Sequence, residues 1–138
     1  MVTHGILASN RSRFAAVVRK FDIEERLIGL ACSACQIAEA LPSRAAGRHV
    51  ARQLIRCGTA PAANYGEAQS AESRRDFVHK LKICLKELRE VRVWLLLIAR
   101  LRLIDREQTH AVLTEADELI SIIVASIRTA QRGDAMTS

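Results

Sequence analysis

Cys32 and Cys35 are the first residues of this chain whose spacing could support chemistry, because a Cys-x-x-Cys pair can bind zinc or exchange disulfides. A zinc site needs four ligands, and the other two cysteines, Cys57 and Cys84, stand alone in the sequence. A redox pair is typical of a helix N-terminus after a strand, whereas this pair falls in the middle of an expected helix. We therefore interpret Cys32 and Cys35 as small buried thiols beside a core stripe, and we expect all four thiols to be reduced and free of metal.

Two carboxylate and histidine pairs, Asp76 with His79 and Glu107 with His110, have the i, i+3 spacing of ligand pairs in di-iron helix bundles. Each pair lies near the start of an expected helix, and the two helices are consecutive in the chain. In an antiparallel bundle these two starts lie at opposite ends, roughly 40 Å apart. We therefore predict no metal site, no cofactor and no catalytic residues, since neither a nucleophile with its base nor a phosphate-binding loop is visible.

Arginines at four-residue spacing are the strongest functional signal. Four of them form a basic ridge on the second expected helix: Arg44, Arg48, Arg52 and Arg56. No acidic residue interrupts residues 40–66, although solvated helix faces usually mix Glu with Arg. Five more basic residues follow on the next helix: Arg74, Arg75, Lys82, Lys86 and Arg89. We predict that these nine residues bind nucleic-acid phosphates without sequence readout, because aromatic residues are few; a plain solvated face is the alternative for the ridge.

The net charge of +6 is unevenly distributed along the chain. Residues 44–102 hold 13 basic and 5 acidic side chains, whereas residues 103–127 hold 1 basic and 5 acidic side chains. One face should therefore attract polyanions, while another should repel them or meet the basic face of a neighbouring molecule.

The elements that must position these residues are helices. Apolar residues make up 49% of the chain, proline occurs twice, and no alternating strand pattern is present. We predict an all-α protein: an N-terminal extension of poorly defined structure at 1–21, an antiparallel up-and-down four-helix bundle at 22–132, and a tail at 133–138. The longest apolar run, 93–99, is too short to span a bilayer, and no secretory signal opens the chain. We therefore expect a soluble cytoplasmic protein.

One long helix at 72–102 organises the bundle. Its apolar residues follow one another at alternating gaps of four and three: Phe77, Leu81, Cys84, Leu88, Val91, Leu95 and Ile98. A second stripe, formed by Trp94, Leu97 and Leu101, lies beside the first. One bundle cannot easily cover both stripes, so we predict that these three residues form an interface between subunits of an oligomer.

The other helices are expected at about 22–41, 44–69 and 105–130. The first should begin at Asp22, an N-cap followed by Glu25 in a capping box. Its inward stripe is predicted at Leu27, Leu30, Ala34, Ile37 and Leu41.

The second helix contains a proline, Pro61, which predicts a kink or a locally broken turn around 57–61. Its inward residues are predicted at Val50, Leu54, Ile55 and Ala62. Asn64 and Glu67 follow the proline by less than two turns. We expect them to hydrogen-bond the backbone that Pro61 frees, or to reach a neighbouring chain.

Three blocks of the sequence resemble one protein family. The blocks are RCGTAPAANYGEAQ at 56–69, SRRDFVHKL at 73–81 and LKELREVRVWL at 85–95. In order and spacing they closely resemble the bacterial four-helix-bundle proteins encoded in intervening sequences of large-subunit rRNA genes, over about 22–132. The resemblance implies a bundle that assembles as a ring-shaped homopentamer and has no established enzymatic activity. A related branch, the accessory variability determinant proteins of diversity-generating retroelements, is similar in fold and binds nucleic acid through a basic surface.

We therefore expect a non-enzymatic oligomeric module that binds the backbone of RNA or DNA through its basic surface. Its expected partners are further copies of this chain in a homopentamer, RNA or DNA, and an acidic or nucleic-acid-processing protein. The alternative is a protein interaction scaffold with no direct nucleic-acid role, whose basic face docks acidic partners.

Overall fold

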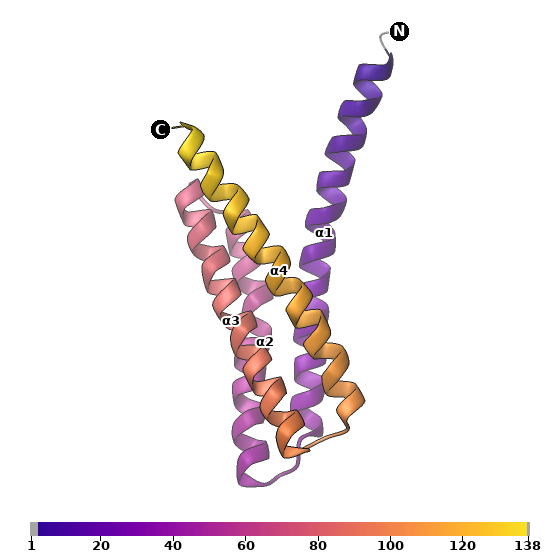
Figure 1. Ribbon diagram of the computed structural model, residues 1–138, viewed down its shortest axis with the longest axis vertical. Coiled ribbons are helices and arrows are strands. Elements are labelled where there is room, and N and C mark those ends of the chain that lie inside the picture. The colour runs from indigo at the N-terminus through magenta and orange to yellow at the C-terminus, as the bar shows by residue number, and fades with distance from the viewer. Residues whose placement is uncertain (1–2, 138) are drawn as a thin grey trace.

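The computed structural model describes the backbone of residues 3–137 and the side chains of residues 22–133. Those residues form helices and no strand: α1 (Thr3–Ala40), α2 (Ala45–Gln69), α3 (Arg74–Leu101) and α4 (Arg106–Thr137). Each helix packs against the next one along the chain, and α4 also contacts α1 (Figure 1). The predicted all-α fold with four helices is therefore confirmed. None of the described helices combines the length and hydropathy that a membrane span requires.

Helix α3 has a well-defined cap at each end. The Ser73 hydroxyl accepts a hydrogen bond from the Asp76 amide at 3.0 Å and so satisfies one free N–H group of the first turn. Just beyond the last turn, Arg102 adopts the left-handed conformation with φ 52° and ψ 45°. The Leu103 amide then donates to the Ile98 carbonyl at 3.1 Å, as in a Schellman motif. Glycine usually occupies this position, so Arg102 carries backbone strain of roughly 1–2 kcal/mol.

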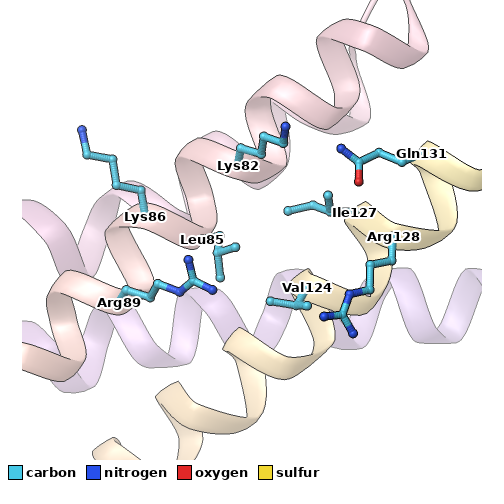
Figure 2. Close-up of a pocket in the computed structure, with 8 residues that line it drawn as sticks. All are labelled: Lys82, Leu85, Lys86, Arg89, Val124, Ile127, Arg128 and Gln131. Carbon is cyan, nitrogen blue, oxygen red and sulfur yellow. The ribbon is translucent and has the colours of Figure 1, made fainter.

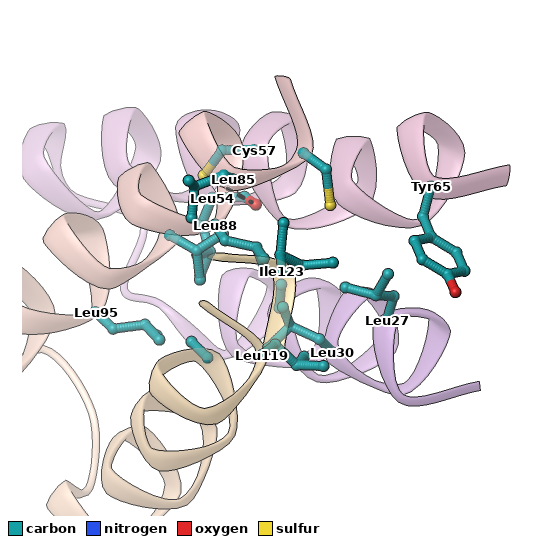
Figure 3. Close-up of a cluster of buried hydrophobic side chains, with 14 of the residues drawn as sticks. Leu27, Leu30, Leu54, Cys57, Tyr65, Leu85, Leu88, Leu95, Leu119 and Ile123 are labelled. Atoms are coloured by element: carbon teal, nitrogen blue, oxygen red, sulfur yellow. Dashed lines mark hydrogen bonds between the residues drawn. The ribbon is translucent and has the colours of Figure 1, made fainter. Parts of the chain in front are cut away.

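The core contains one apolar stripe from each helix (Figure 3). In α3 the whole predicted stripe beyond its first residue is fully buried: Leu81, Cys84, Leu88, Val91, Leu95 and Ile98. The predicted stripe of α1 is buried along its entire length. Phe77, the first residue of the α3 stripe, is only half-buried. Helical periodicity therefore identified the inner faces of these two helices correctly.

The inner face of α2 differs from the prediction. Ile55, expected to point inward, is 41% exposed. The buried stripe runs instead through the residues on either side of Pro61: Val50, Leu54, Cys57, Gly58, Tyr65 and Ala68. Ile55 lies about 100° around the helix from Leu54, which is enough to turn it toward solvent.

Of the two outcomes predicted at Pro61, a kink or a locally broken turn, the broken turn is wrong, because α2 is helical without interruption from Ala45 to Gln69. Proline removes one backbone hydrogen bond, but Pro61 and Cys57 are both buried against neighbouring helices, and this packing keeps the segment helical. The Cys84 thiol of α3 also points to the Pro61 carbonyl, with 3.5 Å between sulfur and oxygen.

Asn64 and Glu67 both find partners within the chain. The Asn64 side-chain amide donates to the Ala60 carbonyl at 2.9 Å, whereas the carbonyl that Pro61 leaves without its usual donor is that of Cys57. Glu67 forms an ion pair with Lys80 of α3, with 2.7 Å between the oxygen and Nζ. The expected bond to the freed backbone is therefore not observed.

Both terminal helices extend beyond their predicted limits. Helix α1 begins at Thr3, so Asp22 lies inside a helix and is not its N-cap. Helix α4 continues through Gly133 to Thr137, where a tail was expected. Neither stretch contains a proline, and the single glycine in each lowers the stability of the helix by only about 1 kcal/mol relative to alanine. Residues 1, 2 and 138 of the predicted extension and tail lie outside the described residues.

The first half of α1 projects past the other helices and away from α4 (Figure 1). Lower in the bundle, α1 and α2 approach closely at Gly58. A Cβ atom at this position would stand 2.4 Å from the Cβ of Ala34. At Gly66, two turns further along α2, a Cβ atom would have no neighbour within 4 Å. Gly58 is therefore required by packing, and Gly66 is not.

We expect Gly58→Ala to lower the free energy of unfolding by about 1–3 kcal/mol, because the added methyl group overlaps Ala34. The matched change Gly66→Ala should raise that free energy by about 0.4–1 kcal/mol, because alanine favours the helix and meets no atom there. Urea unfolding at fixed protein concentration, followed by circular dichroism, measures both effects. Equal stability of the two variants would contradict the close approach of α1 and α2.

Candidate functional site

The nine basic residues predicted to bind nucleic acid lie on two surfaces that belong to different helices. The basic ridge runs from Arg44, the N-cap of α2, along α2 itself, whereas Lys82, Lys86 and Arg89 of α3 line a groove shared with α4 (Figure 2). Arg75 lines the continuation of that groove. The guanidinium of Arg74 lies over Gly133 of α4, where a Cβ atom would stand 2.8 Å from Nη1. The structure therefore brings the α3 residues together with α4 and not with the ridge.

All four arginines of the basic ridge are exposed. Arg48 donates to the Ser43 carbonyl at 2.6 Å, which leaves its positive charge uncompensated. Arg44 and Arg52 form no hydrogen bond or ion pair with any side chain that the structure describes. Three charges of the ridge are therefore available to a ligand.

Arg56, the last arginine of the ridge, is neutralised by α3. It pairs with Glu90 and, at 3.3 Å, with Glu87. The hydrogen bond to Glu90 contributes most to raising the pKa of Arg56. The absence of acidic residues from residues 40–66 thus did not predict the surroundings of this arginine, because its carboxylate partners come from another helix.

The acidic residues of α4 also have partners inside the bundle. Arg26 of α1 pairs with Glu115 and, at 2.6 Å, with Glu118. The hydrogen bond to Glu115 is the largest cause that raises the pKa of Arg26. Arg92 of α3 donates to Asp117 at 2.9 Å. Two arginines from other helices thus face three of the five carboxylates of 103–127, so the predicted acidic face is partly neutralised, and the charge counts along the chain overstated the polarity of the molecule.

The groove between α3 and α4, which we call the basic groove, has an apolar floor and a basic rim (Figure 2). Leu85 of α3 and Val124 and Ile127 of α4 point toward one another and form the floor. The volume of the groove is about 490 Å³. The remaining lining residues are polar or positively charged: Lys82, Lys86, Arg89, Arg128 and Gln131. No lining residue carries a carboxylate.

The basic groove continues toward the start of α3. Lys82 and Gln131 also line an adjoining hollow of about 360 Å³. One edge of α3 therefore presents a basic or histidine side chain at alternating gaps of four and three: Arg75, His79, Lys82, Lys86 and Arg89. This edge is about 21 Å long at 1.5 Å per residue. None of these five side chains forms an ion pair with a side chain of residues 22–133.

Sequence reasoning missed the polar residues His79, Arg128 and Gln131 of the basic groove and its continuation, and it also missed the whole apolar floor. The available signal was the spacing of the basic residues on α3, since they recur at the same alternating gaps of four and three as the apolar stripe of that helix. The residues that α4 contributes depend on the register between the two helices, which periodicity within one helix does not give.

The predicted interface residues lie on the C-terminal half of α3. Leu97 and Leu101 are 36% and 50% exposed, and the neighbouring Val93 is 57% exposed. Trp94 is half-buried, and its ring meets the ring of His49 of α2 edge-on, with centroids 5.7 Å apart. The buried indole N–H has no acceptor among the described residues. Val93, Leu97 and Leu101 thus form an apolar patch on the described surface of the chain.

The four cysteines are free thiols in different surroundings. Cys57 and Cys84 are buried, and burial raises the pKa of each thiol to about 12. Cys35 is half-buried and Cys32 is exposed, so the predicted burial of this pair is wrong for Cys32. Buried Ala34 and Ile37 mark the inner side of α1, and Cys32 lies on the opposite side.

The carboxylate and histidine pairs lie at the first turn of α3 and the first turn of α4, and the Asp76 amide is engaged with Ser73. Among residues 22–133, no three His, Cys, Asp or Glu side chains are placed to hold a metal ion. The described residues therefore offer surfaces for binding and no assembled metal site.

The helices and their exposed basic residues define a protein of the four-helix-bundle class. The model of the 23S rRNA-intervening sequence protein family matches residues 19–125, and the chain belongs to this family. The resemblance carried by the three sequence blocks is thus confirmed.

The chain is also similar to a crystal structure of a protein with unknown function from the S23 ribosomal protein family of Bacteroides thetaiotaomicron. The TM-score is 0.72 and the sequence identity is 30%, over 76% of this chain and 97% of that chain. A comparison with curated proteins finds no match.

We expect Cys32 to react with iodoacetamide in the folded protein while Cys57 and Cys84 stay unmodified at mildly alkaline pH. The thiolate is the nucleophile, and a pKa of about 12 keeps both buried thiols protonated. Mass spectrometry of digested protein measures the modification at each cysteine, and labelling in urea is the control in which all four react. Rapid modification of Cys57 or Cys84 in the folded protein would contradict their burial.

Proposed function

We propose that this protein is a non-enzymatic, oligomeric helix bundle that binds the phosphate backbone of RNA or DNA through the basic ridge. The observation that carries the proposal is the exposure of Arg44, Arg48 and Arg52 along one helix, without a carboxylate partner among the described side chains. Arginines in such a line displace counterions from phosphates, which supplies affinity that does not depend on sequence.

The surroundings of the ridge support binding without base readout. Amide side chains are typical readers of adenine, but Gln53 accepts hydrogen bonds from Arg56, and Asn64 donates to the α2 backbone. The only tryptophan, Trp94, packs against the core and His49, so it offers no stacking platform. The description of the family refers to the intervening sequences of 23S rRNA, which also supports a nucleic-acid partner.

We propose that the bundle is antiparallel and up-and-down, and that copies of it associate through the C-terminal half of α3 into a ring of five. The exposed apolar patch of Val93, Leu97 and Leu101 supports this assembly. The number five rests on the family resemblance. A ring would repeat the basic ridge in every subunit and so add phosphate contacts without new residues.

A protein interaction scaffold is the second candidate, and the apolar floor of the basic groove favours it. Leu85, Val124 and Ile127 offer a surface that a phosphate backbone does not need.

Replacing Arg44, Arg48 and Arg52 together by Gln should weaken binding to mixed-sequence RNA and DNA alike and flatten the salt dependence by about 2–3 units of slope. Fluorescence anisotropy over a range of salt concentrations measures both effects. The matched control replaces three exposed arginines on other helices, Arg100, Arg106 and Arg132, by Gln. Equal binding by the two triple variants would show that the ridge is a solvated face.

Light scattering should give a mass about five times the 15.3 kDa of one chain. Leu97→Glu together with Leu101→Glu should dissociate the assembly, because each places a charge in a buried interface. Ile28→Glu, at an apolar residue of α1 that is 43% exposed, is the matched control and should leave the mass unchanged. A monomer at micromolar concentration would rule out the proposed assembly.

A further inference from the structure

We propose that the basic groove between α3 and α4 docks an acidic amphipathic helix of a partner protein. The inference goes beyond nucleic-acid binding by the ridge, because it concerns a different surface and a different class of ligand. It follows from three properties of the groove, namely its apolar floor, the spacing of its charges and its length.

The apolar floor of the basic groove is complementary to a ligand with an apolar surface. Leu85 and Ile127 are 9% and 7% exposed, and Val124 is half-buried. All three point into the space between α3 and α4 (Figure 2). An amphipathic helix covers such a floor with residues at i, i+3, i+4 and i+7, as in other helix-in-groove complexes. A phosphate backbone presents only anionic and sugar groups, so it would leave the floor unused.

The basic rim of the groove is complementary to acidic residues that flank the apolar stripe of a partner helix. Arg75, Lys82 and Arg89 recur every seven residues along α3, and His79 and Lys86 form a second series with the same spacing. Two helices packed side by side contact each other through residues that repeat every seven positions, and charged residues flank the apolar seam between them. A partner helix with Glu or Asp at its flanking positions would therefore face a basic residue of α3 at each turn.

The opposite wall of the groove, formed by α4, is also positively charged. Arg128 of α4 faces the groove, and no carboxylate lines either wall. The rim charges form no ion pair with a side chain of residues 22–133, so a ligand need not break existing ion pairs with these residues. The edge of about 21 Å matches a helix of roughly 14 residues, or four turns. The geometry thus points to a four-turn helix with an apolar stripe and acidic flanks.

A synthetic peptide of about 16 residues tests the proposal, with Leu at the a and d positions of its heptads and Glu at the e and g positions. Fluorescence anisotropy with the full-length protein should show binding at least about tenfold tighter than that of a control peptide in which Gln replaces Leu. Binding should also persist at salt concentrations that release mixed-sequence oligonucleotides, because part of the affinity comes from apolar burial.

Variants of the protein separate the groove from the ridge. Lys86→Glu with Arg89→Glu should weaken peptide binding at least about tenfold, and both residues are exposed, so the fold is retained. Val124→Ser should weaken peptide binding several-fold and leave oligonucleotide binding unchanged. Arg48→Glu with Arg52→Glu, the matched charge change on the ridge, should leave peptide binding unchanged.

Two results would overturn the proposal. Equal affinity for the control peptide or for a single-stranded oligonucleotide, with no effect of Val124→Ser, would make the groove a general polyanion site. Absence of binding by the amphipathic peptide would show that the groove docks no such helix. Loss of oligonucleotide binding only in the ridge variant bears on the function proposed for the ridge and leaves the groove result intact.

Discussion

Burial of the apolar stripe of α3 fixes the rotation of that helix, and the placement of the charged residues depends on this rotation. With Leu81, Leu88 and Leu95 fully buried, one flank of α3 must face α2 and the other must face α4. The first flank carries Glu87 and Glu90, which meet Arg56, and the other carries the rim of the basic groove. A large-to-small change in this stripe, which costs about 2–5 kcal/mol in typical cores, would loosen both arrangements together.

The ion pairs between helices matter more for ligand binding than for stability. Exposed pairs of this kind contribute about 0–1 kcal/mol each. Their larger effect is to remove particular cations from the binding surface: Arg26, Arg56 and Arg92 each face a carboxylate from another helix. Among the cations that remain, Arg44, Arg48 and Arg52 lie exposed along α2, and Lys82, Lys86, Arg89 and Arg128 line the basic groove. The nucleic acid and the acidic helix that we propose as ligands would therefore occupy different surfaces of the protein.

The sequence predicted those features that repeat within a single helix. The stripes of α1 and α3 followed directly from periodicity, and so did the line of arginines on α2. Features that depend on neighbouring helices were not predictable in this way. The outward position of Ile55, the continuous helix at Pro61 and the neutralisation of Arg56 are all decided by packing or by partners from another helix. The α4 wall of the basic groove requires the register between two helices, which has no signature in either one.

The contact between α1 and α4 is the least extensive of the four helix pairs, and the two helices diverge toward the chain termini (Figure 1). A hollow of about 560 Å³ lies there, lined by Ile23, Phe77 and Ile122 among others. Local opening costs least where few apolar contacts must be broken. The seam between α1 and α4 is therefore the one whose opening should cost least, and because α4 is also the outer wall of the basic groove, the packing of α4 against α3 alone fixes the width of that groove.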